Sequence, residues 1–211
     1  MNFHGDTDKL SHHVAKGKFE AFWQKTESGK GNSAGFKKLI QFSIKKKIPL
    51  HTVSTDVLDQ NMNDAFKKFM DGKCLMPDLV SRAKNIGDAR RMLVTHDNAM
   101  RSLSKGKILI ATIDGEYHRQ GKDIVTSLFR GIGFNTIDIG LGVPVEDIVR
   151  AVQRHRPDYL GISASILTTI PKIKTLINGL KKDGKLKKTK LIIGGHIAKE
   201  ALAKSIGAAH Y

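Results

Sequence analysis

The chain has 211 residues, with 36 Lys and Arg against 20 Asp and Glu, which leaves a net charge of +16 at pH 7. Its 40% hydrophobic residues suffice for a buried core and exclude a wholly disordered chain. The single cysteine, Cys74, excludes a disulfide framework and a zinc site made of several cysteines. No apolar run approaches the ~18 residues of a membrane span, and residues 1–16 lack the apolar core of a signal peptide. We therefore expect a cytoplasmic protein with no membrane segment.

The charge surplus has two explanations. It is typical of proteins with an anionic partner, such as nucleic acid, a membrane surface or an acidic protein. A solvated lysine-rich surface produces the same composition, and the densest basic run, residues 181–190, falls between a predicted helix and a predicted strand. Aromatic residues make up only 6% of the chain, which is few for a surface that stacks bases.

The first half of the chain is predicted to be helical. Residues 1–35 form a polar tail with one short amphipathic helix, and residues 36–104 repeat apolar side chains at helical spacing. Within that region, Thr55 is a candidate cap for a helix that stops at Asp71-Gly72, and Met76-Pro77-Asp78 is a typical start for the next one. We expect a small helical bundle over residues 36–104.

The pattern changes near residue 105. Strand-like apolar runs alternate with helical segments; the predicted strands are 107–113, 135–139, 159–163 and 190–193, and the predicted helices are 121–131, 144–155, 170–180 and 198–205. Strict alternation with short connections predicts an α/β fold with a doubly wound, Rossmann-like or flavodoxin-like parallel sheet. Such sheets bind ligands beyond the carboxyl ends of their strands.

The loop after the first predicted strand holds a carboxylate and an imidazole two residues apart. Glu116 can hold one ring nitrogen of His118 and leave the other nitrogen free as a ligand or base. An exposed loop histidine without a function is the alternative. The loop lacks the glycine pattern of a phosphate-binding loop.

Two further loops carry hydroxyls and glycines at the same edge of the predicted sheet. Residues 161–169 include Ser163, Ser165, Thr168 and Thr169, which either cap the next helix or bind a polar ligand. The pair Gly194-Gly195 either forms a tight turn or lets a backbone approach closely. Together with His118, these features suit a long, bulky ligand better than a nucleotide phosphate.

The motifs carry a resemblance to a known family. Within residues 111–125, Glu116-x-His118-x-x-Gly121 resembles the cobalamin-binding signature Asp-x-His-x-x-Gly of corrinoid proteins and methionine synthase. The Ser-x-Leu motif of that family falls on residues 163–165, and its Gly-Gly motif falls on Gly194-Gly195. Residues 36–104 are similar to the helical cap domain of the family, and residues 105–211 to its cobalamin-binding domain.

The resemblance implies a role for each motif. His118 is expected to be the lower ligand of cobalt, with Glu116 on its far nitrogen and the Thr169 hydroxyl further along the relay. Ser163 is expected to contact the buried nucleotide tail, and Gly194-Gly195 to line its channel. The full set of cofactor-binding candidates is Gly115, Glu116, Tyr117, His118, Arg119, Gln120, Gly121, Ser163, Ser165, Leu167, Thr168, Thr169, Gly194 and Gly195. Tyr117 packs either on the macrocycle or against the protein.

The sequence departs from the family pattern in several places. Glu116 stands where the signature has Asp, so its carboxylate is one methylene further from the backbone. Ser165 replaces the Leu of Ser-x-Leu, while Ser165-Ile-Leu167 matches that motif two residues later. Arg119 and Gln120 stand where an acid and an apolar residue are more common. The chain ends at residue 211 where the family has one more helix, so we expect a partner or a second copy of the chain to cover that face.

Three functions fit these observations. The first is a non-catalytic methyl carrier that shuttles a methyl group between a substrate-specific methyltransferase and a methyl-acceptor methyltransferase; 211 residues leave no room for a catalytic barrel as well. The second is a cobalamin-binding sensor. The third is a basic nucleic-acid-binding protein on the same scaffold, which the loop chemistry disfavours.

Overall fold

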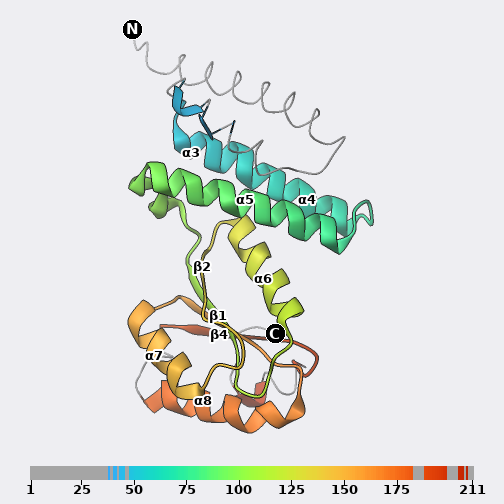
Figure 1. The fold of residues 1–211 in the computed structure, drawn as a ribbon, viewed down its shortest axis with the longest axis vertical. Helices are drawn as coiled ribbons and strands as arrows, with labels where there is room; N and C mark the ends of the chain where they lie inside the picture. The colour runs from blue at the N-terminus through green and yellow to red at the C-terminus, as the bar shows by residue number, and fades with distance from the viewer. Residues whose placement is uncertain are drawn as a thin grey trace. The chain divides into compact units, whose positions relative to one another are not determined.

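The structure, a computed structural model, describes residues 38, 40, 41, 43–45, 48–182, 188–198, 204–206 and 208. Contacts divide the chain into two compact units, both drawn in Figure 1. Unit 1 comprises Met1–Ser104 with Arg130–Gly133, and unit 2 comprises Lys105–Phe129 with Phe134–Tyr211. The predicted polar tail and residues 199–203 of the last predicted helix lie outside the described residues.

Unit 1 is helical over its described residues. Its elements are α3 (Leu50–Thr52), the π-helix η1 (Val53–Asp59), α4 (Gln60–Met70), α5 (Met76–His96) and the 3-10 helix η2 (Asn98–Leu103). Helix α4 ends as predicted, because Gly72 takes a φ of 69° that other residues rarely adopt. Helix α5 begins at Met76-Pro77, where the Asp78 carboxylate accepts the Leu75 N–H at 3.1 Å.

The predicted cap at Thr55 is wrong. Helical structure already begins at Leu50, directly after Pro49, and runs through η1 into α4. The Thr55 hydroxyl donates to the carbonyl of His51, one turn back, at 3.1 Å, so it bonds within the helix. A threonine followed by an acid has the same local pattern before a helix and inside one. Only the turn that precedes the threonine distinguishes the two positions.

Arg90 ties three segments of unit 1 together. Its guanidinium donates to the Ser54 hydroxyl at 3.0 Å, to the Asp59 carboxylate at 2.8 Å and to the Gly131 carbonyl at 3.1 Å. Burial lowers the pKa of Arg90, and the Asp59 charge acts in the opposite direction. Since each edge of the guanidinium has a partner, the buried charge is compensated.

Unit 2 is built on a four-stranded sheet in the order β2-β1-β3-β4, with every pair parallel. The strands are β1 (Lys107–Thr112), β2 (Asn135–Asp138), β3 (Tyr159–Ser163) and β4 (Lys190–Gly194). They alternate with α6 (Arg119–Ile132), α7 (Val145–His155), the 3-10 helix η3 (Leu167–Thr169) and α8 (Ile170–Lys182). The predicted α/β class is confirmed.

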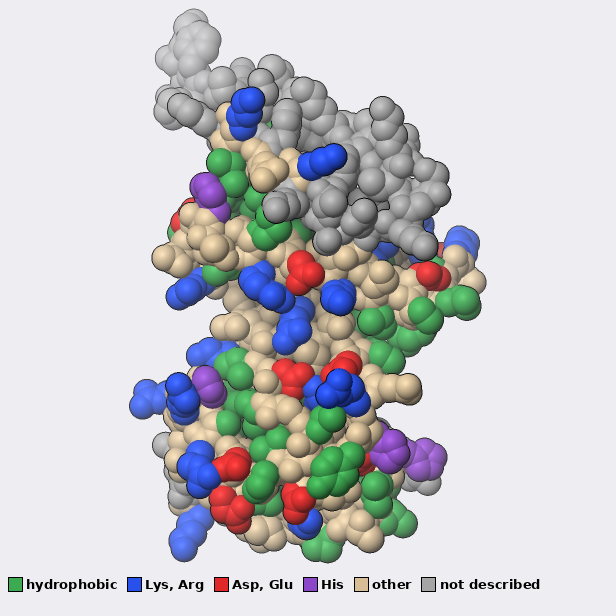
Figure 2. Space-filling model, in the orientation of Figure 1, with side chains coloured by type: hydrophobic (Ala, Val, Ile, Leu, Met, Phe, Trp, Pro, Cys, Tyr) green, Lys and Arg blue, Asp and Glu red, His purple; other side chains and the backbone are tan. Residues whose placement is uncertain are grey.

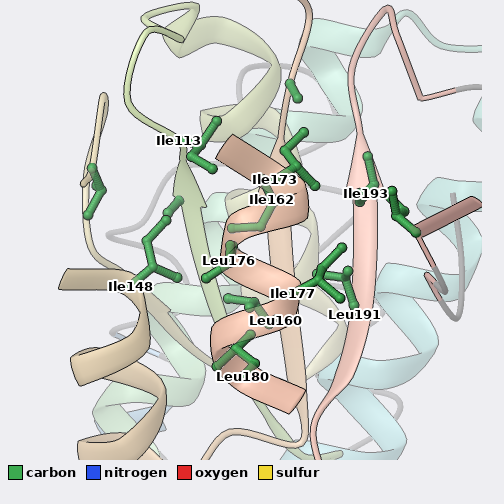
Figure 3. Close-up of a cluster of buried hydrophobic side chains, with 14 of the residues drawn as sticks. Ile113, Ile148, Leu160, Ile162, Ile173, Leu176, Ile177, Leu180, Leu191 and Ile193 are labelled. Carbon is green, nitrogen blue, oxygen red and sulfur yellow. The ribbon is translucent and has the colours of Figure 1, made fainter. Parts of the chain in front are cut away.

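Helices α7 and α8 cover one face of this sheet (Figures 1 and 3). Figure 3 shows Leu176 and Ile177 of α8 lying against Leu160 of β3. The buried cluster comprises strand residues Leu109, Ala111, Leu160, Ile162, Leu191 and Ile193 with helix residues Ile148, Val152, Ile173, Leu176, Ile177 and Leu180. This apolar layer fixes the strands and therefore the edge from which their loops leave.

The strand order places a topological switch point between β1 and β3. The chain leaves β1 for β2 on one side, then returns past β1 to form β3 on the other. Thr112 pairs with Ser163, and Ser163 pairs with Gly194, so β1, β3 and β4 end at the same level. The loops after these strands diverge there, which is where sheets of this kind bind ligands.

Gly131 is predicted to tolerate no side chain. A Cβ there would lie 2.8 Å from the Cα and Cβ atoms of Ala83 and 2.9 Å from the sulfur of Met62. We expect Gly131→Ala to destabilise the protein by about 1–3 kcal/mol through overpacking. The matched control is Gly179→Ala in α8, where the new Cβ lies 3.6 Å from Val149, and we expect stabilisation of about 0.5–1 kcal/mol. Thermal unfolding compares them; a melting temperature of Gly131→Ala at or above that of the parent contradicts the packing.

Candidate functional site

The side chain at the centre of the site is Glu116, which is fully buried although it lies in a loop. Its Oε1 accepts the backbone N–H of His118 at 2.9 Å and is also hydrogen-bonded to Nδ1 of the same histidine. Its Oε2 accepts the backbone N–H of Ser165. One carboxylate therefore joins the loop after β1 to the loop after β3, across the switch point.

These hydrogen bonds keep the carboxylate ionised. Burial by itself raises the pKa of Glu116, because it penalises the charged form. The backbone N–H groups of His118 and Ser165, followed by the imidazole, outweigh burial and hold the pKa below that of an ordinary glutamate. At neutral pH the carboxylate is thus an acceptor for every donor that faces it.

An ionised carboxylate on Nδ1 fixes the state of the His118 ring. Because the ionised carboxylate can only accept, Nδ1 is the ring nitrogen that donates to Glu116, and Nε2 is left for another partner. The His118 side chain is 67% exposed, and no described residue donates to or accepts from Nε2. The site therefore offers one imidazole nitrogen, supported by a buried acid, to a metal that comes from outside the protein.

A salt bridge fastens the start of the same loop to α8. Nζ of Lys172 donates to the Asp114 carboxylate at 2.6 Å and to the Asp114 carbonyl at 3.2 Å. The hydrogen bond from Lys172, and then its charge, lower the pKa of Asp114. Gly115 follows with a φ of 91°, which turns the chain towards Glu116.

The hydroxyl residues after β3 divide between two tasks. Ser165 meets the Glu116 carboxylate through its backbone N–H, and its hydroxyl lies 3.5 Å from the backbone N–H of His196. The Thr169 hydroxyl, for which a place in the relay stays a prediction, donates to the carbonyl of Ile166 at 2.7 Å. Ser163 is the last residue of β3 and lies between Thr112 and Gly194 in the sheet.

The two glycines after β4 have different reasons to be glycine. Gly195 has a φ of 114°, and a Cβ there would lie 2.2 Å from the carbonyl oxygen of Ala164. The close backbone approach expected from the sequence is thus an approach to the protein's own β3 loop. At Gly194 a Cβ would meet nothing within 4 Å, so this exposed residue leaves open space beside Ser163.

The remaining predicted residues lie on the surface. Arg119, Gln120, Gly121, Leu167 and Thr168 are all exposed. Tyr117 is 65% exposed, and its ring lies against the loop after β2: a Cβ on Gly142 would be 2.3 Å from Cε1 of the ring. In this structure the Tyr117 ring contacts the protein, and its packing on the macrocycle stays a prediction.

The loop after β2 carries none of the site residues predicted from the sequence. The structure places a cleft of about 580 Å³ there, lined by Arg119, Lys122, Asp123, Asp138, Ile139, Gly140 and Leu141. Lys122 is buried between the carboxylates of Asp138 and Asp123, the latter at 2.9 Å. The signal that could have found this loop is the run of Gly140 and Gly142 after a strand that ends in an acid.

The site residues suit a metal that is already bound in a cofactor better than a free metal ion. In the part of the chain that the structure describes, no three His, Cys, Asp or Glu side chains gather to hold a free ion, and no helix is long and apolar enough to span a membrane. His118 offers one ring nitrogen, Nε2, while Glu116 holds the other. At the end of β4, Gly194 leaves open space. A macrocycle that already holds its metal requires only one such protein ligand.

Comparison with known proteins decides which cofactor this is. A family model described as the B12 binding domain matches residues 106–211, about half of the chain. The chain belongs to the B12-binding corrinoid protein family. The match confirms cobalamin, the cofactor expected from the motifs.

Relatives in this family include proteins named for their corrinoid. The chain is 33% identical to dimethylamine corrinoid protein 3 of Methanosarcina mazei over 153 residues, which cover 71% of this chain and 90% of the relative. It is also 33% identical to the dimethylamine corrinoid protein of Methanosarcina barkeri, with 73% of each chain covered.

Solved structures show the same fold at lower identity. A chain of the methanol:cobalamin methyltransferase complex of Methanosarcina barkeri matches with a TM-score of 0.78 at 23% identity, covering 97% of this chain and 74% of that one. A cobalamin-binding protein of Desulfitobacterium hafniense matches with a TM-score of 0.67 at 21% identity, covering 93% and 90%.

The Asp114–Lys172 pair predicts a pH-dependent contribution to stability. Because the folded state lowers the pKa of Asp114, the contribution is present above the ordinary Asp pKa of about 3.9 and is lost as the pH falls through the lower, folded-state pKa. We expect Lys172→Met to be less stable than the parent at pH 7, with a difference that shrinks in acid. Urea unfolding of both proteins at pH 7 and in acid measures this difference in stability. The substitution Lys174→Met, at an exposed lysine of the same helix, is the control. A difference that does not change with pH contradicts the assignment.

Proposed function

We propose that this chain is a corrinoid methyl carrier that holds cobalamin with His118 as the lower ligand of cobalt. The observation that carries the proposal is the buried Glu116 carboxylate, which bonds Nδ1 of the largely exposed His118 side chain and leaves Nε2 for another partner. Relatives named dimethylamine corrinoid proteins support a place in a methyltransferase system. The proposed partners are a substrate-specific methyltransferase and a methyl-acceptor methyltransferase.

The protein's contribution to the reaction is to hold the metal ligand and its proton. When bound, the corrinoid supplies a cobalt centre that accepts and releases a methyl group. His118 would present Nε2 to the metal, and the Glu116 carboxylate on Nδ1 would make Nε2 a better donor to it. With the cofactor bound, the Glu116 carboxylate would hold Nδ1 of His118 in place, so that Nε2 would be the nitrogen facing the metal.

The nucleotide tail of the cofactor is proposed to lie along the ends of β3 and β4. Ser163 and Gly194 are paired neighbours in the sheet, and Gly194 leaves space on its open side. Gly195 supports this arrangement indirectly, because it lets the β3 loop approach β4. Ser163 is the proposed contact of the tail base, and Thr169 keeps a structural bond to Ile166.

On the face of unit 2 drawn in Figure 2, the charge distribution favours a protein partner over nucleic acid. Figure 2 shows Lys and Arg side chains interspersed with Asp and Glu over the unit 2 surface that faces the viewer. Recognition of a phosphate backbone calls for a continuous basic stripe. Mixed charges of this kind suit steering and orientation between proteins.

Replacement of His118 tests the proposal most simply. We expect the purified protein, reconstituted with hydroxocobalamin, to show the absorbance of histidine-ligated cobalt and His118→Ala to lose it. His196→Ala is the control, because His196 is also exposed and follows β4 at the same edge of the sheet. Identical spectra for the parent and His118→Ala refute the ligand assignment.

A second measurement separates the carrier from the sensor. We expect the parent protein, loaded with methylated cobalamin, to pass its methyl group to a free thiol. Retention of a photolabile adenosyl upper ligand, without any transfer of methyl, favours the sensor instead.

A further inference from the structure

Thr112 bonds to two of the loops that surround the site. It is the last residue of β1 and is fully buried. Its hydroxyl donates to the carbonyl of Glu116 at 2.6 Å and accepts the backbone N–H of Gly142 at 2.7 Å. A single side-chain oxygen therefore connects the loop that carries His118 with the loop after β2.

The backbone around Thr112 already pairs these loops in part. The Thr112 N–H donates to Gly140 at 3.2 Å, and its carbonyl accepts the N–H of Val143 at 2.9 Å. The N–H of Asp114 then donates to Val143 at 2.9 Å. Beyond Asp114 the pairing between the two loops stops. The Glu116 N–H then donates to the carbonyl of Ile113 at 2.9 Å, within its own loop, and the Thr112 hydroxyl holds the Glu116 carbonyl.

The chemistry of this position requires a hydroxyl. The Glu116 carbonyl needs a donor and the Gly142 N–H needs an acceptor, and a hydroxyl serves as both at once. Valine has the same shape but deprives the buried Glu116 carbonyl and the half-buried Gly142 N–H of this partner. Serine keeps both bonds and gives up only a methyl group.

We propose that Thr112 is a positioning residue for the cobalt ligand. The Glu116 carboxylate is held by the amides of His118 and Ser165, and its peptide is held by Thr112. Together these contacts set the direction in which His118 presents Nε2. They also make the loop after β2, with Gly142 against the Tyr117 ring, move with the ligand loop. This inference rests on the proposed function.

Two other buried threonines of unit 2 provide matched controls. Thr189 donates to the carbonyl of Pro157 at 2.7 Å, just before β4 and thus at the opposite edge of the sheet from the site. Thr126 in α6 is buried with a hydroxyl that has no partner among the described residues. Thr189→Val therefore removes a buried bond away from the site, and Thr126→Val removes none.

The experiment compares Thr112→Val, Thr112→Ser, Thr189→Val and Thr126→Val with the parent, all reconstituted with hydroxocobalamin. We expect Thr112→Val to bind cobalamin about tenfold more weakly, the usual effect of losing a partner behind a metal ligand, and to show less histidine-ligated absorbance. Thr112→Ser is expected to keep both the cobalamin affinity and the histidine-ligated absorbance of the parent. Thr189→Val is expected to lower the melting temperature and leave the spectrum unchanged.

Hydrogen exchange in the protein without cofactor tests the same link independently. We expect the Gly142 amide to exchange faster in Thr112→Val than in the parent and Thr112→Ser. If Thr112→Val does not fold, Thr112→Ala takes its place, because the smaller side chain leaves room for a water.

The outcomes separate the two claims. Histidine-ligated cobalt in the parent with an unchanged spectrum and affinity in Thr112→Val overturns the positioning role, as does an equal spectral loss in Thr189→Val. No histidine ligation in the parent refutes the proposed function instead. Unchanged Gly142 exchange in Thr112→Val overturns the positioning role whatever the cofactor does.

Discussion

A carboxylate removed from water must be hydrogen-bonded, and the geometry of this site follows from how Glu116 meets that requirement. Its donors are two backbone amides and an imidazole, taken from loops that follow β1 and β3. Those loops come together only because β1 and β3 are parallel neighbours at the switch point of the sheet. The apolar layer of α7 and α8 in turn holds the strands in register.

The contacts of Glu116 also explain how the site accommodates two of the departures from the family signature, those at Glu116 and Ser165. The glutamate, one methylene longer than the usual aspartate, still engages both the backbone and the ring of His118. Its second oxygen reaches the backbone N–H of Ser165, a contact that depends on the main chain and not on which side chain follows Ser163. The change at Ser165 is therefore compatible with the same carboxylate network.

The sequence predicts the strands of unit 2 and the Glu116–His118 pair, because both are encoded locally: the strands by apolar runs, the pair by its spacing. Contacts that form only in the tertiary structure could not be predicted from the sequence. The role of Thr112, the engagement of Thr169 with Ile166 and the reason for Gly195 each depend on a loop far along the chain or on how a turn folds back. The cap at Thr55 failed because a threonine inside a helix and one before it look alike in sequence.

The central claim is that the nitrogen on cobalt comes from the protein, through Nε2 of His118, and not from the nucleotide base of the cofactor. The most direct measurement is electron paramagnetic resonance of the protein loaded with cobalamin in its Co(II) state, prepared with and without ¹⁵N-labelled histidine. We predict that the nitrogen splitting of the cobalt signal changes to the ¹⁵N pattern in the labelled protein. A splitting unaffected by the label shows that the base of the cofactor remains on the metal and contradicts the account.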